Sequence, residues 1–512
     1  MPIKPGPWQV AVTLALLAAA PARAEAPLSA IDWLSQSVAT PAASTAPPEP
    51  AVALNGLPQD VTVTVLDAPA PDAVGLLPAR VTGLPRALWG MGRTADIAAL
   101  ITRQHAEALP ALQSLLITLL LAEADPPVDA GGKGDLLLTR IDKLLDIGAL
   151  EQAAALLQAS GAATVDLFRR AFDVALLTGS EDQACAAMQA TPDLAPTFTA
   201  RIFCLARAGD WNAAALTLQT GKALALITPA EAVLLTRFLD TTLDEGATDL
   251  PQPEKPTPLV WRLFEAIGQP LATAPLPLAF SNADLSETAG LKAQIEAAER
   301  LARVGAIAPN QLLGIYTLGA PAASGGVWDR VEAFQRFDAA LTKADAPAVA
   351  QHLPLVWAQM AEAELEVPFA TLYTDALLKM QLEGEAGAIA FRVALLSSRY
   401  EQAARARAPA DATEAFLIGL ARGSLQGVAP PDSMARAIAP AFLQPQPAAD
   451  ALAMLAEDRL GEAVLAAIDR IGRGVEGDLR GVTEGLALLR HVGLEDVARR
   501  TALELMLLER RG

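Results

Sequence analysis

Two glycine-rich segments contain residue types that can cradle a phosphate. Gly472-Arg-Gly474-Val-Glu-Gly477 satisfies the Gly-x-Gly-x-x-Gly spacing of dinucleotide sites, in which the glycine turn follows a strand and opens a helix. The residues before it, 462–471, have a helical pattern instead, so we expect a loop between helices. Gly131-Gly-Lys-Gly134 lacks the spacing and the Ser/Thr of a phosphate loop, and it is also predicted to be a loop.

The titratable residues form no catalytic or metal-binding set. The only histidines are isolated, with no His or Cys at metal-ligand spacing: His105, His352 and His491. Glu362, Glu364 and Glu366 alternate along a segment predicted to be helical. Residues two apart on a helix do not share a face, so we expect solvated charges rather than an acid–base pair. The sequence therefore predicts a protein that is not an enzyme and that has no cofactor and no metal.

The two cysteines, Cys185 and Cys204, have a spacing that favours a disulfide. Counted outward from the connection 191–197, they lie at similar distances along two consecutive antiparallel helices, so their side chains can meet. Closing a loop of roughly 20 residues would stabilise the fold by about 3 kcal/mol in the chain-entropy estimate. The alternative is two buried free thiols that act as small apolar residues.

One short turn recurs in the part of the chain that contains the two cysteines. It is found as Gly148-Ala-Leu-Glu-Gln-Ala153, Gly179-Ser-Glu-Asp-Gln-Ala184 and Gly209-Asp-Trp-Asn-Ala-Ala214, so that the glycines are 31 and 30 residues apart. Glycine takes a positive φ and ends one helix, and the polar residues after it cap the next helix. A small alanine five residues after the glycine lets the two helices pack closely. The period fits two helices and two turns.

This turn resembles the corner of the tetratricopeptide (TPR) repeat, whose two helices meet at a Gly-Asp-Tyr-Glu-Glu-Ala-like sequence. The copy that begins at Gly209 is the nearest match, and looser copies begin at Ser398 and Gly493. The resemblance implies an all-α fold, a TPR-like α-solenoid of antiparallel helix hairpins. Such solenoids bind a peptide or a helix in their concave groove.

The hydrophobic periodicity divides the chain into a leader and two helical parts, 73–248 and 259–512, with a Pro-rich break at 249–258 between them. An alternating segment at 61–65 fits one short strand. The predicted helices are 94–108, 110–124, 135–147, 150–159, 164–178, 181–190, 195–208, 211–221, 229–241, 259–267, 287–304, 309–317, 327–342, 352–365, 369–380, 386–396, 449–457, 460–471, 479–490 and 494–509. A further short helix is expected within the Pro-rich stretch 426–447.

Residues 1–24 have the form of a secretory signal peptide. Lys4 is the positive charge, 10–20 is apolar but too short to span a bilayer, and Ala22-Arg23-Ala24 fits the small-x-small cleavage pattern. Cleavage is expected after Ala24, and the Ala- and Pro-rich composition favours a periplasmic protein without a permanent membrane span. The alternative is an N-terminal membrane anchor.

Residues 25–72 are predicted to be a disordered tether rich in Pro and Ala. Within it, the segment 28–37 carries Leu28, Ile31 and Leu34 at helical spacing, with Trp33 alongside. A short amphipathic segment on a tether is a candidate docking motif for another protein. The alternative is that it packs back on its own helices.

The net charge of −19 argues against binding a nucleic acid backbone through general electrostatics. We therefore expect a non-enzymatic periplasmic scaffold or adaptor that binds another envelope protein. Two alternatives remain: an accessory or glycan-binding protein of peptidoglycan metabolism, and a periplasmic partner of a motility or secretion machine.

Overall fold

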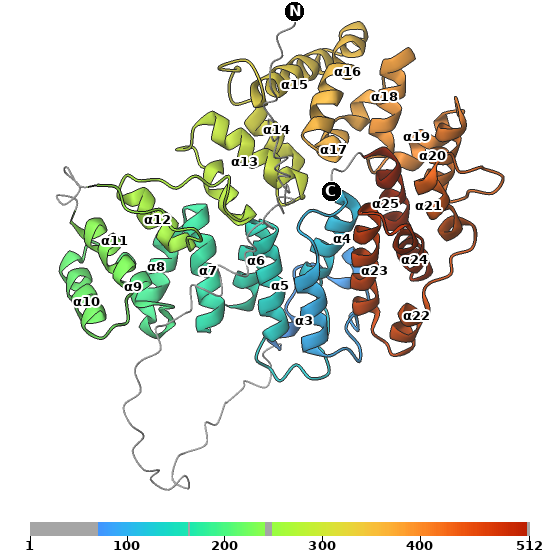
Figure 1. Ribbon diagram of the computed structural model, residues 1–512. Helices are drawn as coiled ribbons and strands as arrows, with labels where there is room; N and C mark the ends of the chain where they lie inside the picture. The colour runs from blue at the N-terminus through green and yellow to red at the C-terminus, as the bar shows by residue number, and fades with distance from the viewer. Residues whose placement is uncertain (1–69, 162–163, 241–247, 509–512) are drawn as a thin grey trace, which may run out of the picture.

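The computed structural model describes residues 70–161, 164–240 and 248–508, which fold into α-helices and short 3₁₀ helices without a β-strand among them (Figure 1). The all-α fold class is therefore confirmed. The leader, the docking motif and the short strand expected at 61–65 lie outside the described residues. Pro71 and Asp72, assigned to the tether from the sequence, belong to a first 3₁₀ turn that packs on a later helix.

The helices follow one another with short connections. The first group is η1 (Pro71–Ala73), α2 (Ala79–Thr82), α3 (Thr94–Arg103), α4 (Pro110–Leu121), α5 (Asp135–Asp146), α6 (Leu150–Ser160), α7 (Val165–Thr178), α8 (Glu181–Ala190), η2 (Pro192–Leu194), α9 (Phe198–Arg207), α10 (Trp211–Ala223) and α11 (Pro229–Leu239). The second is α12 (Pro258–Ala266), η4 (Leu278–Leu285), α13 (Leu291–Arg303), α14 (Pro309–Tyr316), α15 (Val327–Thr342), α16 (Ala346–Glu362), α17 (Glu366–Leu377) and α18 (Gly384–Leu395). The last is α19 (Tyr400–Ala406), α20 (Ala412–Arg422), α21 (Ser433–Leu443), α22 (Ala449–Ala456), α23 (Leu460–Val475), α24 (Leu479–His491) and α25 (Glu495–Leu507).

The same backbone corner joins many of these helices. Its central residue has a positive φ, and the N–H of the next residue donates to the carbonyl five residues before it, which satisfies an orphan carbonyl at the helix end. The corner residues are Gly148, Gly179, Gly209, Ala225, Gly268, Gly305, Ala344, Glu364, Gly423, Asp458, Gly477 and Gly493. At Gly209 the following residue, Asp210, also accepts a hydrogen bond from Ala213 N at 3.0 Å and so caps α10. The corner found in three copies in the sequence thus recurs through most of the fold.

Helices α3 to α11 form a row (Figure 1). Helix α3 packs on α5, and from α4 onward consecutive helices pack together as hairpins. Two buried basic side chains of α5, Arg140 and Lys143, hold together the first helices of this row. Arg140 donates to the carbonyls of Leu120 at 2.7 Å and Ala122 at 3.0 Å, and Lys143 donates to that of Gln104 at 2.9 Å. Both therefore bind the carbonyl-rich C-terminal ends of α4 and α3, where a positive charge is stabilising. Burial lowers the pKa of Arg140 to about 10, and its side chain remains charged at neutral pH.

The chain turns back after α11, and its last helices cover the beginning of the row. Helix α12 and η4 pack on α7, and α23 and α25 pack on α3 and α4. The Glu504 carboxylate of α25 accepts a hydrogen bond from Ala111 N, in the first turn of α4, at 2.9 Å. Gly461 N donates to Leu88 O at 2.8 Å, beside the buried ring of Trp89. The two ends of the described chain are thus held together, which no sequence pattern had indicated.

The Gly-x-Gly-x-x-Gly segment is not a loop, and this expectation was wrong. Gly472 and Gly474 lie inside α23, and the segment's last glycine, Gly477, is the corner before α24. A Cβ on Gly474 would lie 2.3 Å from Val482 Cγ2, and one on Gly485 would lie 2.5 Å from Ile471 Cγ1. The glycines therefore allow α23 and α24 to pack with their backbones close together. The segment 131–134, in contrast, is the loop that was expected.

The three alternating glutamates do not share one helix, so their interpretation is also corrected. Glu362 ends α16, Glu364 is the corner residue with φ +57°, and Glu366 begins α17. The expectation of solvated charge fails for Glu366, which is buried. Their arrangement follows from the corner and not from a helix face.

Candidate protein-docking site

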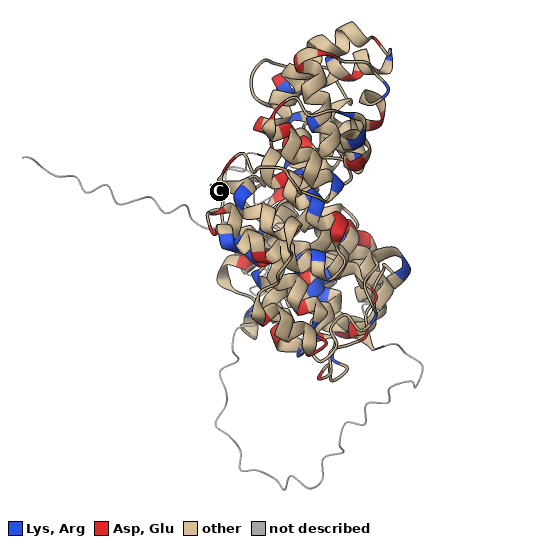
Figure 2. Cartoon of the chain, turned by 90° about the vertical axis from the view of Figure 1, so that its right-hand side faces the viewer, with Lys and Arg blue, Asp and Glu red and all other residues tan. Residues whose placement is uncertain are grey.

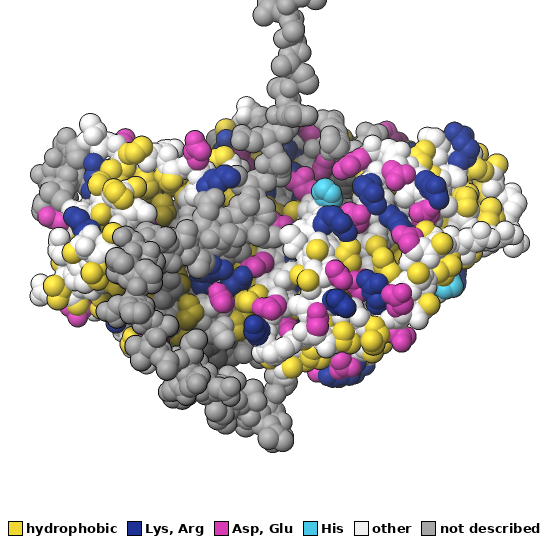
Figure 3. All heavy atoms as spheres, turned by 60° about the horizontal axis from the view of Figure 1, so that its bottom comes forward, with side chains coloured by type: hydrophobic (Ala, Val, Ile, Leu, Met, Phe, Trp, Pro, Cys, Tyr) yellow, Lys and Arg dark blue, Asp and Glu magenta, His cyan; other side chains and the backbone are white. Residues whose placement is uncertain are grey.

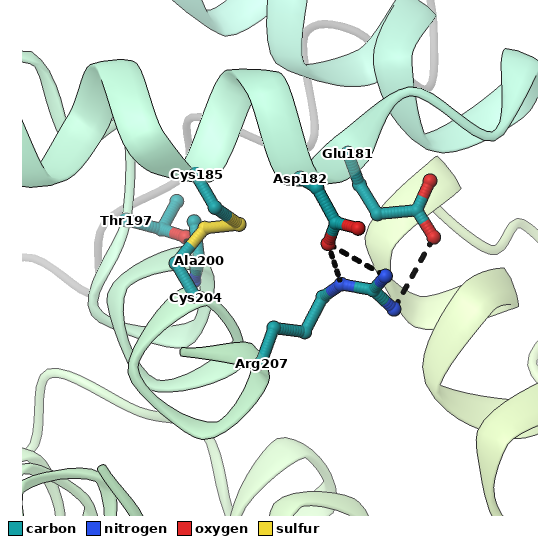
Figure 4. The surroundings of a disulfide bond; sticks show 7 residues. All are labelled: Glu181, Asp182, Cys185, Thr197, Ala200, Cys204 and Arg207. Carbon is teal, nitrogen blue, oxygen red and sulfur yellow. Dashed lines mark hydrogen bonds and ion pairs between the residues drawn. A yellow bond between two sulfur atoms is a disulfide. The ribbon is translucent and has the colours of Figure 1, made fainter. Parts of the chain in front are cut away.

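The predicted disulfide is present between α8 and α9. The Cα atoms of Cys185 and Cys204 are 5.1 Å apart, and both residues are buried (Figure 4). Thr197 caps α9 by accepting a hydrogen bond from Ala200 N at 3.0 Å. Arg207, one turn beyond Cys204, pairs with Asp182 at 2.7 Å across the same two helices (Figure 4). The disulfide thus joins two helices that their own turn already brings together.

Removing this disulfide by the pair Cys185→Ala and Cys204→Ala is expected to lower the free energy of unfolding by about 3 kcal/mol, because the unfolded chain regains a loop of about 20 residues. Chemical denaturation of the oxidised wild type and of the double variant measures the difference. An equal loss on reducing the wild type would assign the effect to the covalent bond. A variant as stable as the oxidised wild type would contradict the prediction.

The three histidines singled out from the sequence lie in separate parts of the fold, after α3, in α16 and at the end of α24. His105 and His491 are exposed and His352 is half-buried. No cluster of His, Cys, Asp and Glu within the described ranges is suited to a metal ion. Leu28, Ile31, Trp33 and Leu34 lie outside these ranges.

A buried charge cluster on α7 was not found from the sequence. Arg170 forms two hydrogen bonds with the Asp142 carboxylate of α5, at 2.5 and 2.6 Å. Asp173, one turn along, is 4% exposed, and its Oδ2 has no hydrogen-bond partner among the described residues. Burial raises the pKa of Asp173 to about 7, although Arg169 and Arg170 act against it. Its position inside the helix row makes it a determinant of stability rather than a binding residue.

The outer end of the row, formed by α10 and α11, exposes apolar side chains. Leu216 is 70% exposed, Leu224 61%, Trp211 51% and Val233 50%. Ala214 and Leu218, on the other face of α10, are buried, as expected for the face that packs on α9. Hydrophobic side chains are visible at this left-hand end of the molecule (Figure 3). One end of the row is covered by α23 and α25. At this end α12 packs on α11, and the four apolar side chains of α10 and α11 named above remain exposed.

A cavity of about 390 Å³ lies in the same end. It is lined by Lys222, Pro229, Ala232, Val233, Thr236 and Arg237. The α11 residues among them recur at intervals of three and four and so form one face of the helix. Arg237 also donates to Thr248 O at 2.7 Å, which holds the chain after α11 beside the cavity. The site is therefore an apolar groove with a cationic edge. We call it the α10–α11 groove.

Basic and acidic residues are intermixed along the described helices that face the viewer in Figure 2. The α10–α11 groove escaped the sequence analysis because the periodicity of α10 shows which residues can be buried but not whether a face is covered. The one available signal was Leu216, an apolar residue outside the stripe of Ala214 and Leu218.

Within the described ranges, none of the helices combines the length and the apolar character that crossing a bilayer requires. Comparison of the chain with protein-family models, with curated proteins and with solved structures gave no match.

Proposed function

We propose that the chain is a non-enzymatic scaffold of the periplasm, and that it binds another envelope protein through the α10–α11 groove and the apolar side chains around it. The observation that carries the proposal is the exposure of Leu216, Leu224 and Val233 at the α10–α11 end of the helix row. An array of hairpins needs a polar outer face at each end to remain soluble, and an exposed apolar patch marks a protein-binding surface.

The repeated corner supports the interpretation of the row as a TPR-like solenoid, a form that presents extended surfaces to protein partners. The disulfide between Cys185 and Cys204 supports an oxidising compartment, because such bonds persist mainly outside the cytoplasm. Together with the signal-like leader, it favours the periplasm. The exposed leucine and valine side chains around the groove favour a protein over a glycan as the ligand.

Site-specific photocrosslinking in intact cells tests the proposal. A photoreactive amino acid replaces Leu216 in one variant and Val233 in a second, and the control variant carries it in place of Leu355, a 53% exposed residue of α16. We expect one and the same envelope protein to be captured from positions 216 and 233, in at least tenfold excess over position 355.

A second substitution checks that the adduct depends on the groove. Ala232→Glu places a charge on the floor of the groove and should abolish capture from position 216 while the protein remains folded by circular dichroism. Equal capture at all three positions, or no adduct at 216 and 233, would overturn the proposed function.

A further inference from the structure

The lining of the α10–α11 groove includes two basic side chains, Lys222 and Arg237. Lys222 is exposed at its edge. The groove's floor is apolar, with Pro229, Ala232 and Val233. A ligand that fits both features has an apolar helical face and a carboxylate beside it.

One segment of this chain has that composition. Leu28, Ile31 and Leu34 recur at helical spacing, and Asp32 stands between the second and the third. We propose that the segment 28–37 docks in the α10–α11 groove of the same molecule, with its apolar residues on Val233 and its neighbours and with Asp32 near Lys222. It would then compete with the partner of the proposed function for one surface.

The length of chain between the two sites fits this pairing. The described chain begins at residue 70, next to η1, which packs on α5. From α5 to α11 there are three steps between alternate helices, about 30 Å at 8–10 Å per step. The 32 residues from 38 to 69 include six prolines, and an extended Pro-rich chain of this length reaches at most about 100 Å at about 3.1 Å per residue. This reach exceeds the distance between the two sites, so the contact can form within one molecule.

Disulfide trapping in the full-length protein, purified from the periplasm, tests the contact. The pair Leu34→Cys and Val233→Cys is compared with the control pair Leu34→Cys and Leu355→Cys, both oxidised under the same mild conditions and analysed by peptide mass spectrometry. We expect at least tenfold more intramolecular 34–233 product than 34–355 product, with a yield independent of protein concentration.

Charge exchange supplies the second readout. Asp32→Lys should reduce the 34–233 product at least fivefold, and adding Lys222→Asp to it should restore most of the yield. Equal trapping of both pairs would overturn the inference, and so would product found only between two molecules or a yield unchanged by Asp32→Lys.

The self-docking contact and the proposed function depend on the same surface but on different ligands, so each can fail without the other. A partner captured at positions 216 and 233 without the 34–233 product would remove the self-docking contact and leave the proposed function. The 34–233 product without a captured partner would remove the proposed function and leave a groove that binds the chain's own segment.

Discussion

Gly90→Ala is expected to separate the two ends of the described chain and to lower the stability of their contact by about 3 kcal/mol or more. A Cβ at this position would lie 1.7 Å from the carbonyl oxygen of Asp458, a backbone atom that side-chain rotation cannot move aside. Gly90 also has φ +42°, a conformation that alanine adopts only with strain. The hydrogen bond from Gly461 N to Leu88 O is adjacent and should be lost with it.

Hydrogen exchange of peptides that cover 84–92 and 457–465 measures this loss, and Gly83→Ala is the matched control. Gly83 has φ +72°, but a Cβ there would meet no atom within 4 Å. Its cost should be limited to the backbone strain, about 1 kcal/mol, without faster exchange at 457–465. If both variants changed hydrogen exchange at 457–465 equally, the effect of Gly90→Ala would not come from a clash with Asp458, and the prediction would be wrong.

Asp173→Asn is expected to stabilise the protein at pH 8 by about 2 to 4 kcal/mol. The pKa of Asp173 is raised by burial from 3.8 to about 7, so the folded state binds this proton more tightly than the unfolded state does. The ionised carboxylate therefore destabilises the fold. Its cost grows as the pH rises from about 4 and is complete above about 7. The Asn variant carries no such charge and should gain stability over the same interval.

Chemical denaturation at pH 4.5 and pH 8 measures this effect. The advantage of Asp173→Asn should be largest at pH 8 and should fall to about a quarter of that value at pH 4.5. Asp142→Asn is the control, because it breaks the two short hydrogen bonds to Arg170 and should destabilise the protein at pH 8. A loss of stability at pH 8 in both variants would show that Asp173 is paired in the folded protein and would contradict the prediction.

The sequence predicted helices well where local signals agree and less well where they conflict. The corners at Gly148, Gly179 and Gly209 were recognised because glycine takes a positive φ without strain. The corners at Ala344 and Asp458 have the same geometry without glycine, and the short connections and the packing of the helices impose it. A residue-by-residue pattern contains no sign of that constraint.

Proline caused the largest boundary error. Pro354 lies inside α16, which begins at 346, six residues before the predicted start. The helix 412–422 was missed because it lies between two irregular segments and contains Gly419, a weak helix former, close to the Gly423 that ends it. The disulfide could be predicted because both cysteines lie near one local turn. The contact of α25 with α4 could not, since nothing local encodes a pairing across most of the chain.

The bond between Ala111 and Glu504 spans 393 positions, and this has a consequence for how the protein is made. Leu112 and Leu116 are fully buried in the finished molecule, yet α25, which packs on their helix, is the last helix of the described chain to be synthesised. During synthesis, α4 is made long before α25 and waits with this surface uncovered, a state that invites aggregation. A chaperone that binds nascent apolar helices would therefore matter most for the residues that are synthesised earliest.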